Sequence, residues 1–312
     1  RPNRSVENAI AAIYRLMQKS GLHYVVEFDI KGFFDNVDHS KLIKQLWSLN
    51  IRDKELLYVI RRILKAPILM PDGHTEHPTK GTPQGGNLSP LLSNIYLTRF
   101  DRMLEERGHR FVRYADDCNI YVKSKRASQR VMDSCKQYLE GKLKLKVNKS
   151  KSRTASPLRS KFLGFSLYKM RSKTGIRPHE KSLRRFKARL RELTSRRQAR
   201  SIEMILLRLR RFTVGWLSYY SISDMKSKIK ELNEWLRRRI RQIFWKQWKK
   251  VSAKFKNLKK LGVPKGKAWE WSNSRLGYWR ISGSWILQTS LKNKYLESIG
   301  YDDISKRYEA LH

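Results

Sequence analysis

The sequence predicts an α+β fold, an antiparallel sheet backed by helices, followed by an all-α domain. In the first half, short runs of aromatic and β-branched residues alternate with stretches of helical period, in the order strand, helix, hairpin, helix, strand. From about residue 178 the composition changes to long arginine-rich segments whose apolar residues recur every three or four positions. The chain therefore divides into a mixed layer and a helical part.

The elements of the first half can be placed in order. A helix over 6–19 precedes a strand over 23–30. A second helix, with Asp38 as its N-cap, carries Leu42, Ile43 and Leu46, and a third follows at about 53–65. The next segments are a hairpin turn at 70–74, a glycine-rich loop at 80–90 that feeds a helix to about 107, a hairpin over 111–122, a helix over 124–143, and strands at 145–147 and 162–167.

The second half is expected to contain helices over 181–197, 199–220 and 224–250, and then a basic linker over 254–267. In the third helix the buried stripe is expected to consist of Leu232, Leu236, Ile240 and Ile243, which recur at helical spacing. Arg237, Arg238 and Arg241 are expected to face elsewhere. Arginine on a helix face is often only solvated, but the density here favours contact with nucleic-acid phosphates.

The charge balance restricts the choice of partner. The 312 residues include 69 Lys and Arg against 27 Asp and Glu, a formal net charge of +42. A polyanion, most simply nucleic acid, is the expected partner, and an anionic membrane surface is the alternative. No apolar run is long enough to span a bilayer. Cys118 and Cys135 form no CxxC pattern and are expected to be reduced core thiols of a cytosolic protein. No signal peptide is visible, and because the chain opens at Arg1 we expect a truncated protein.

Two acidic strand ends form the candidate site. Asp116 and Asp117 lie at the tip of the hairpin in RYADD, where a solvated turn is the alternative reading. Asp29 closes an apolar strand, where an unpaired carboxylate would be costly. If the two strands are neighbours, these carboxylates converge into an oxygen cage suited to Mg²⁺ and to two-metal phosphoryl chemistry.

The motifs FDIKGFFDNVDH, GTPQGGNLSPLLSNIYL, RYADD and FLGF occur in an order that resembles the reverse-transcriptase palm of group II intron-encoded proteins. The segments RRFTVGWLSYYSISDM and LNEWLRRRIRQIFWKQWKK resemble the maturase (thumb, or X) domain of that family. The resemblance implies a palm with residual fingers over 1–170, a helical thumb over 171–255, and a basic, Trp-rich extension of the maturase and DNA-binding region over 256–312.

The resemblance also implies roles for single residues. Asp29 and Asp116 would hold two Mg²⁺ ions, with the Ile30 carbonyl as an added ligand and Asp117 completing the cluster. The primer 3′-hydroxyl would attack the α-phosphate of an incoming dNTP. Lys151 would donate a proton to the pyrophosphate, and Lys149 competes for this role.

Other residues would contact the nucleotide or the template. Phe34 matches the family's sugar gate, a flat ring that leaves no room for a 2′-hydroxyl, and a core Phe is the alternative. Gln84 and Gly85 match the loop that contacts nucleotide and template, and Arg4 belongs to the residual fingers. Because most of the fingers are absent from this sequence, we expect the triphosphate grip to be incomplete.

The resemblance implies an RNA-directed DNA polymerase that binds group II intron RNA, assists splicing, and copies an RNA template from a DNA primer during retrohoming into target DNA. It implies a ribonucleoprotein of the bacterial cytosol, and it leaves a dimer open. No Cys/His cluster or HNH pattern is present, so second-strand cleavage is not expected. The alternatives are a non-catalytic RNA-binding splicing factor and a specialised reverse transcriptase of a defence or diversity system.

Overall fold

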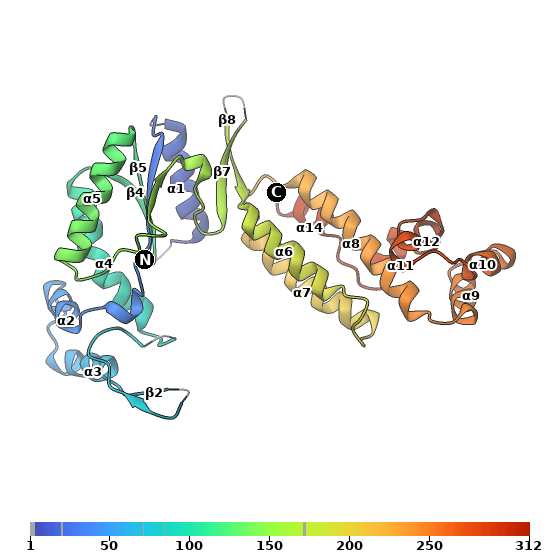
Figure 1. Cartoon of the computed structure of the whole chain (residues 1–312), viewed down its shortest axis with the longest axis horizontal. Coiled ribbons are helices and arrows are strands. Elements are labelled where there is room, and N and C mark those ends of the chain that lie inside the picture. Colours follow the sequence, from blue (N-terminus) through green and yellow to red (C-terminus); the bar gives the residue numbers. More distant parts are fainter. Residues whose placement is uncertain (1–3, 20, 71, 84, 171–172) are drawn as a thin grey trace. The chain divides into compact units, whose positions relative to one another are not determined.

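The computed structural model describes residues 4–19, 21–70, 72–83, 85–170 and 173–312. The chain separates into two units, Arg1–Gly175 and Ile176–His312. Figure 1 shows the sheet in the first unit and the long helices of the second.

A four-stranded antiparallel sheet forms the centre of the first unit. Its strand order is β4 (Arg110–Tyr114), β5 (Asp117–Val122), β1 (Tyr24–Phe28) and β6 (Arg153–Ala155). Phe28 lies opposite Cys118, and Val26 opposite Ile120. Since side chains alternate along a strand, these four residues share one face of the sheet and join the main apolar core.

Helices cover both faces of this sheet. On the core face lie α4 (Ser89–Glu106) and α5 (Lys125–Gly141), and α1 (Val6–Lys19) lies on the other face (Figure 1). The core continues into α2 (His39–Ser48) and α3 (Lys54–Leu64). Asp38 and Asp53 cap these two helices by accepting hydrogen bonds from amides of their first turns. The helices predicted for this half are thereby confirmed.

The predicted strand at 145–147 is wrong. Only an isolated bridge joins Ile30 and Val147, and the edge strand is β6, which pairs with β1 at residues 153–155. The chain leaves α5 through Lys144 at φ +57°, which interrupts extended backbone just before this segment. The predicted hairpin turn at 70–74 is flanked by β2 (Ile68–Leu69) and β3 (Thr75–Glu76).

The FLGF segment leads into a second, smaller sheet. Strand β7 (Phe165–Met170) pairs with β8 (Lys173–Pro178), and the boundary between the two units falls within β8. Two 3₁₀ turns, η1 (Phe34–Asn36) and η2 (Pro157–Arg159), complete the first unit. The strand predicted at 162–167 therefore begins later, after a bridge between Phe162 and Phe165.

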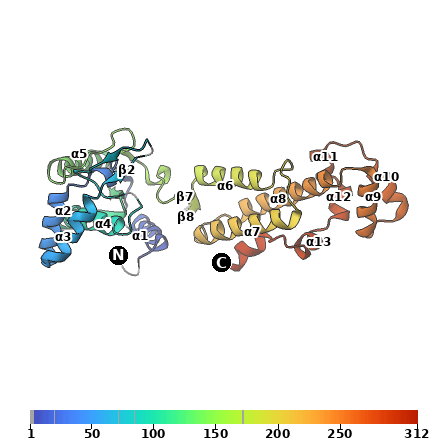
Figure 2. The same ribbon diagram turned by 90° about the horizontal axis from the view of Figure 1, so that it is seen from below.

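The second unit consists of helices. Helices α6 (Glu180–Leu193) and α7 (Ile202–Tyr219) run side by side (Figure 1). The longest helix, α8 (Lys226–Gln247), contacts the short helices α11 (Tyr278–Ser282) and α14 (Ile304–Ala310), and Figure 2 shows α8 and α11 from below. The predicted linker at 254–267 is instead largely helical. The short helices are α9 (Val251–Lys260), α10 (Lys265–Ser272), α11 (Tyr278–Ser282), α12 (Trp285–Ser290), α13 (Asn293–Ser298) and α14 (Ile304–Ala310).

The predicted buried stripe of α8 is confirmed, because Leu232, Leu236, Ile240 and Ile243 are all buried. The prediction that Arg241 faces away from the core is wrong. Its side chain is 7% exposed and donates from Nε to the Leu291 carbonyl. The pattern of α8 alone places Arg241 on the solvent face, but the segment that follows α8 folds back and covers this residue.

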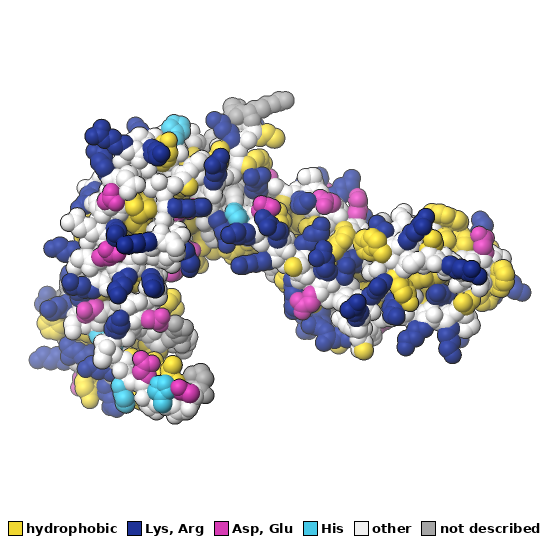
Figure 3. Space-filling model, viewed as in Figure 1, with side chains coloured by type: hydrophobic (Ala, Val, Ile, Leu, Met, Phe, Trp, Pro, Cys, Tyr) yellow, Lys and Arg dark blue, Asp and Glu magenta, His cyan; other side chains and the backbone are white. Residues whose placement is uncertain are grey.

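Cys118 and Cys135 are both buried and free, as the sequence predicts for core thiols. Across the described part of the chain, no helix is both long and apolar enough to cross a bilayer. Lys and Arg side chains cover much of the surface seen in Figure 3, and acidic side chains are few there.

Candidate active site

The register of β1 and β5 brings the predicted acidic residues to one end of the sheet. Phe28 pairs with Cys118, so the next residues outward are Asp29, which directly follows β1, and Asp117, the first residue of β5. Tyr114 pairs with Asp117 across the hairpin, which leaves Asp116 in the connecting turn. The structure therefore gathers Asp29, Asp116 and Asp117, residues far apart in sequence, at a common strand end.

The pKa of Asp117 is sensitive to the two neighbouring carboxylates. The pKa of its carboxyl is raised, chiefly by desolvation and then by the negative charges of Asp116 and Asp29, while Lys161 opposes the shift. Adjacent carboxylates that repel one another in this way provide a favourable place for a cation.

The donor set fits Mg²⁺ of the kind held together with substrate. Carboxylate and carbonyl oxygens are its preferred ligands. Among the described residues, no group of three His, Cys, Asp and Glu side chains is placed to hold a metal ion by itself. Mg²⁺ in polymerase-type sites is characteristically held by one or two carboxylates together with substrate phosphates, so a complete protein cage is not required.

The Ile30 carbonyl is oriented toward the hairpin side. Hydrogen bonds flank Ile30, from the Asn148 amide to the Asp29 carbonyl and from the Lys31 amide to the Lys146 carbonyl. Ile30 and Val147 are thus the non-hydrogen-bonded pair of an antiparallel bridge, and the polar backbone groups of Ile30 point away from Val147. This orientation agrees with the role that the resemblance implies for the carbonyl.

The segment after Val147 fixes the backbone of Asp29. The Asp29 amide donates to Ser152 Oγ at 3.1 Å, and its carbonyl accepts from the Asn148 amide at 2.8 Å. Lys151 Nζ lies 3.7 Å from Asp29 Oδ2, and Lys149 lines a neighbouring basic groove with Lys31. The proximity to Asp29 favours Lys151 over Lys149 as the proton donor, and this role stays a prediction.

The glycine-rich loop is joined to the turn that carries Phe34. The Thr82 amide donates to the Phe34 carbonyl at 2.6 Å, and the Gly81 amide donates to the Val37 carbonyl at 2.7 Å. Gly81 has φ +94°, and a Cβ there would lie 3.0 Å from the Phe34 carbonyl oxygen. His39 Nε2 lies 2.7 Å from the Gly81 carbonyl. Only glycine fits this close approach of two backbones.

The nucleotide-binding predictions fall partly on described residues. Phe34 is half-buried and its ring centroid lies 5.5 Å from that of Phe33, which is fully in the core. Gly85 is exposed at φ +78°, and Arg4 is exposed just before α1. Gln84 lies outside the described residues. The roles of these four residues stay predictions.

Sequence reasoning missed the residues that support the hairpin. Asp101 is a carboxylate, 3% exposed, among the buried apolar residues of α4, and its partner is Arg113 of β4. The sequence did carry a signal for this pair: Asp101 falls on the same helix face as Leu97 and Leu104, where a carboxylate needs a partner. His39 was missed as well, because a single histidine in a helix carries no pattern.

In the second unit, the three predicted RNA-binding arginines have intramolecular partners. Arg237 Nη1 lies 3.2 Å from Asp303 Oδ2, and the Arg238 guanidinium lies 3.9 Å from the centroid of the Trp279 ring. All three border a groove of about 730 Å³. Arg241 donates to the Leu291 carbonyl and to Asn293 Oδ1, so little of its side chain faces solvent, and its role as an RNA contact stays a prediction.

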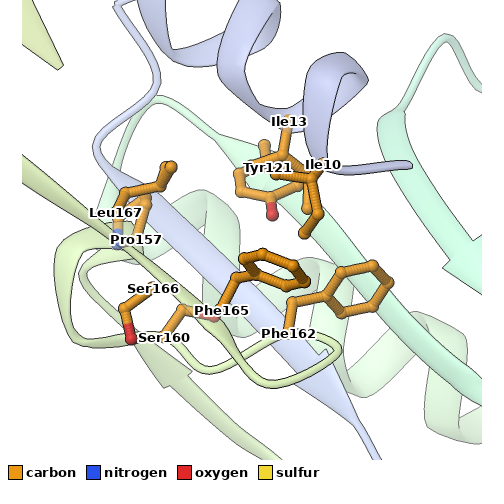
Figure 4. A pocket seen from close by; sticks show the side chains of 9 residues that line it. All are labelled: Ile10, Ile13, Tyr121, Pro157, Ser160, Phe162, Phe165, Ser166 and Leu167. Carbon is orange, nitrogen blue, oxygen red and sulfur yellow. The ribbon is translucent and has the colours of Figure 1, made fainter. Parts of the chain in front are cut away.

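A small apolar pocket lies where the FLGF segment packs on the sheet. Ile10 and Ile13 from α1 approach Tyr121, Phe162 and Phe165 (Figure 4). Its volume is about 20 Å³, close to that of one water molecule. We interpret it as a packing seam that fixes FLGF against α1, because it has no room for a nucleotide.

Comparison with known proteins identifies two matching families. Residues 1–167 match the model of reverse transcriptase (RNA-dependent DNA polymerase), and residues 183–262 match that of the group II intron, maturase-specific domain. The chain is 33% identical over 240 residues to the group II intron-encoded protein LtrA of Lactococcus lactis, covering 56% of this chain and 39% of LtrA. It is 30% identical over 218 residues to the protein YkfC of Escherichia coli, covering 56% and 55%.

The chain thus spans about two fifths of LtrA and just over half of YkfC. Among solved structures, apo telomerase from Candida tropicalis is similar with a TM-score of 0.46 at 15% identity, covering 99% of this chain and 57% of that one. The same enzyme truncated from its C-terminal domain gives 0.44 at 18% identity, covering 55% and 40%.

Proposed function

Because the chain belongs to the reverse transcriptase family and carries a group II intron maturase-specific domain, we propose that it is an RNA-directed DNA polymerase of a group II intron. Its substrates are an RNA template, a DNA primer and dNTPs. Its helical unit binds the intron RNA, assists splicing and supports retrohoming into target DNA. The observation that carries the polymerase proposal is the convergence of Asp29, Asp116 and Asp117 at one strand end.

Asp29 and Asp116 would hold Mg²⁺, with the Ile30 carbonyl and Asp117 as further oxygen donors. Two such ions would activate the primer 3′-hydroxyl and neutralise the charge that develops on the pyrophosphate. The fit rests on the gathering of the carboxylates at one strand end, where desolvation and then the charges of Asp116 and Asp29 raise the pKa of Asp117. Since a proton competes with the cation for the same oxygens, the site works best with all three carboxylates ionised.

The chain's own residues orient the reactants. Phe34 begins the 3₁₀ turn η1, and its carbonyl accepts from the Thr82 amide, while the Val37 carbonyl just after η1 accepts from the Gly81 amide. A ring whose backbone is fixed in this way beneath the sugar would exclude a 2′-hydroxyl. Lys151, beside Asp29, is positioned to give a proton to the leaving pyrophosphate. The hydrogen bond that fixes the Phe34 backbone supports the sugar-gate assignment, because steric discrimination between dNTPs and NTPs requires a ring that does not move.

The RNA surface is best assigned to α6, α7 and the loop between them. Arg185, Arg191, Arg197, Arg200, Arg210 and Arg211 are exposed there. Exposed arginines can neutralise phosphates and release counterions, which a buried residue such as Arg241 cannot do. Arg237 and Arg238 lie at the edge of the groove and would add weaker phosphate contacts, because Asp303 and Trp279 already engage part of each guanidinium group.

Primer extension tests this proposal. The chain is incubated with poly(rA)/oligo(dT), dTTP and Mg²⁺, in parallel with poly(dA)/oligo(dT) and with EDTA. We expect extension on the RNA template that requires Mg²⁺ and that Asp116→Asn abolishes without changing the affinity for RNA. RNA binding without any Mg²⁺-dependent extension would instead identify a non-catalytic splicing factor.

A further inference from the structure

The turn that carries Asp116 adopts a backbone conformation that its sequence does not favour. Tyr114 and Asp117 pair across the hairpin, so Ala115 and Asp116 form a two-residue turn. Ala115 has φ +54°, a region that residues with a Cβ rarely adopt, and Asp116 does not share it. A turn with positive φ only at its first central residue is of type II′, where glycine is the usual residue. An interaction from outside the turn must therefore hold Ala115.

Arg113 provides that interaction. Its Nη1 donates to the Ala115 carbonyl at 2.5 Å and to Asn94 Oδ1 at 3.1 Å. Its Nε and Nη2 donate to the two carboxylate oxygens of Asp101 at 2.6 and 2.5 Å. The side chains of Arg113 and Asp101 are only 8% and 4% exposed. A desolvated, bidentate pair of this kind fixes the plane of the guanidinium.

We propose that Arg113 is a positioning residue for the acidic cluster. Anchored on α4 through Asp101 and Asn94, it holds the Ala115 carbonyl and thereby sets the orientation of the two carboxylates that follow. This inference rests on the proposed function, in which those carboxylates bind Mg²⁺. An ion pair that served only to stabilise the fold would need the two bonds to Asp101, and not the further bond to the turn.

Two variants separate positioning from stability. Arg113→Lys retains the charge opposite Asp101, but one ammonium group cannot also reach the Ala115 carbonyl in the same geometry. Arg113→Met/Asp101→Leu replaces the buried pair by apolar side chains, a change that proteins commonly tolerate. The control is Arg307→Met/Asp302→Leu, which removes another bidentate Arg–Asp pair, a more exposed one, from the second unit.

Each full-length variant is tested in two ways. Primer extension is titrated with Mg²⁺, and hydrogen–deuterium exchange is measured for the peptide that spans residues 112–118. For both Arg113 variants we expect the Mg²⁺ midpoint to rise about 10- to 100-fold, as is usual when a group that orients metal ligands is lost. We also expect faster exchange of the 112–118 peptide, while the exchange of the peptide that contains β1 is unchanged. The control should alter neither readout.

An unchanged Mg²⁺ midpoint, with only a lower melting temperature, would show that Arg113 is merely structural and would overturn the proposal. Unchanged exchange of the turn would overturn it as well. If the wild-type chain extends no primer, the proposed function fails, while the exchange measurement still decides whether Arg113 holds the turn.

Discussion

Phe28 of β1 lies directly opposite Cys118 of β5 in antiparallel register. This one pairing determines where the carboxylates meet, because it makes Asp29 and Asp117 the next residues beyond the paired ends of the two strands. A shift of register by one residue would turn the side chains of one strand to the opposite face of the sheet and take Asp117 out of line with Asp29. The core contacts of Val26, Phe28 and Ile120 oppose such a shift.

Replacement of Phe34 by alanine tests the sugar gate. Phe34→Ala removes the ring from a turn whose backbone is fixed by Thr82, so the space opened beneath the sugar should accept a 2′-hydroxyl. We expect the preference for dTTP over UTP, measured as the ratio of kcat/KM, to fall roughly tenfold or more. Phe33→Leu, a change in the adjacent core ring, is the control. An unchanged ratio would return Phe34 to a packing role.

Gly81 is expected to tolerate no side chain. In Gly81→Ala the Cβ would press on the Phe34 and Asp35 carbonyl oxygens at 3.0 Å, and the residue would have to retain φ +94°. The cost should be about 1–3 kcal/mol of unfolding free energy, together with a higher KM for dNTP, since the loop and the Phe34 turn would separate. Thermal melting and steady-state kinetics measure the two effects.

The control for this change is Gly73→Ala. Gly73 has φ +88° and nothing within 4 Å of its virtual Cβ, so this variant has the conformational strain without the clash. It should lose some stability and keep the KM of the wild type. Equal KM values for the two variants would contradict a role of Gly81 in docking the loop.

The salt dependence of RNA binding tests the surface assignment in the helical unit. The logarithm of the affinity should fall linearly with the logarithm of the salt concentration, and Arg210→Ala/Arg211→Ala should reduce the slope by about 2. Arg241→Met should leave the slope unchanged and lower the stability, because its guanidinium is bonded to Leu291 and Asn293. A reduced slope for Arg241→Met, with none for the double variant, would reverse this assignment.

Asp303 should make the second unit sensitive to acid. Burial by itself would raise its pKa, but hydrogen bonds from Asn233 and from the Lys306 and Ser305 amides, with the charge of Arg237, lower the pKa below its usual range. A carboxyl whose pKa is lower in the folded state contributes stability above its unfolded pKa of about 3.9, and this contribution is lost as the pH falls through the folded value.

We therefore expect Asp303→Asn to destabilise the unit by about 1–3 kcal/mol at pH 7, and the difference from the wild type to shrink as the pH falls through the lowered folded pKa of Asp303. Tryptophan fluorescence during urea unfolding is the measurement. It reports on this unit, since all nine tryptophans except Trp47 lie beyond residue 175. A difference that persisted unchanged in acid would show that the charge of Asp303 is not the cause.

The sequence was sufficient where a local pattern determines the structure. The period of apolar residues placed the helices, and two acidic strand ends indicated the site. It was insufficient where distant residues meet. The exposure of Arg241 depends on helices that return over α8, and the dependence of the Ala115 turn on Asp101 crosses from one element to another. The strand β6 was missed because three residues carry too little pattern to separate an edge strand from a loop.

The central claim is that Asp29 and the hairpin carboxylates act as one cation site, and Mg²⁺-dependent extension of oligo(dT) on poly(rA) by Asp29→Asn tests it most directly. The exposed Asp133 of α5 provides the control variant, Asp133→Asn. We predict that Asp29→Asn extends no primer at any Mg²⁺ concentration and binds RNA as the wild type does, while Asp133→Asn is fully active. Extension by Asp29→Asn at the wild-type rate would contradict the account.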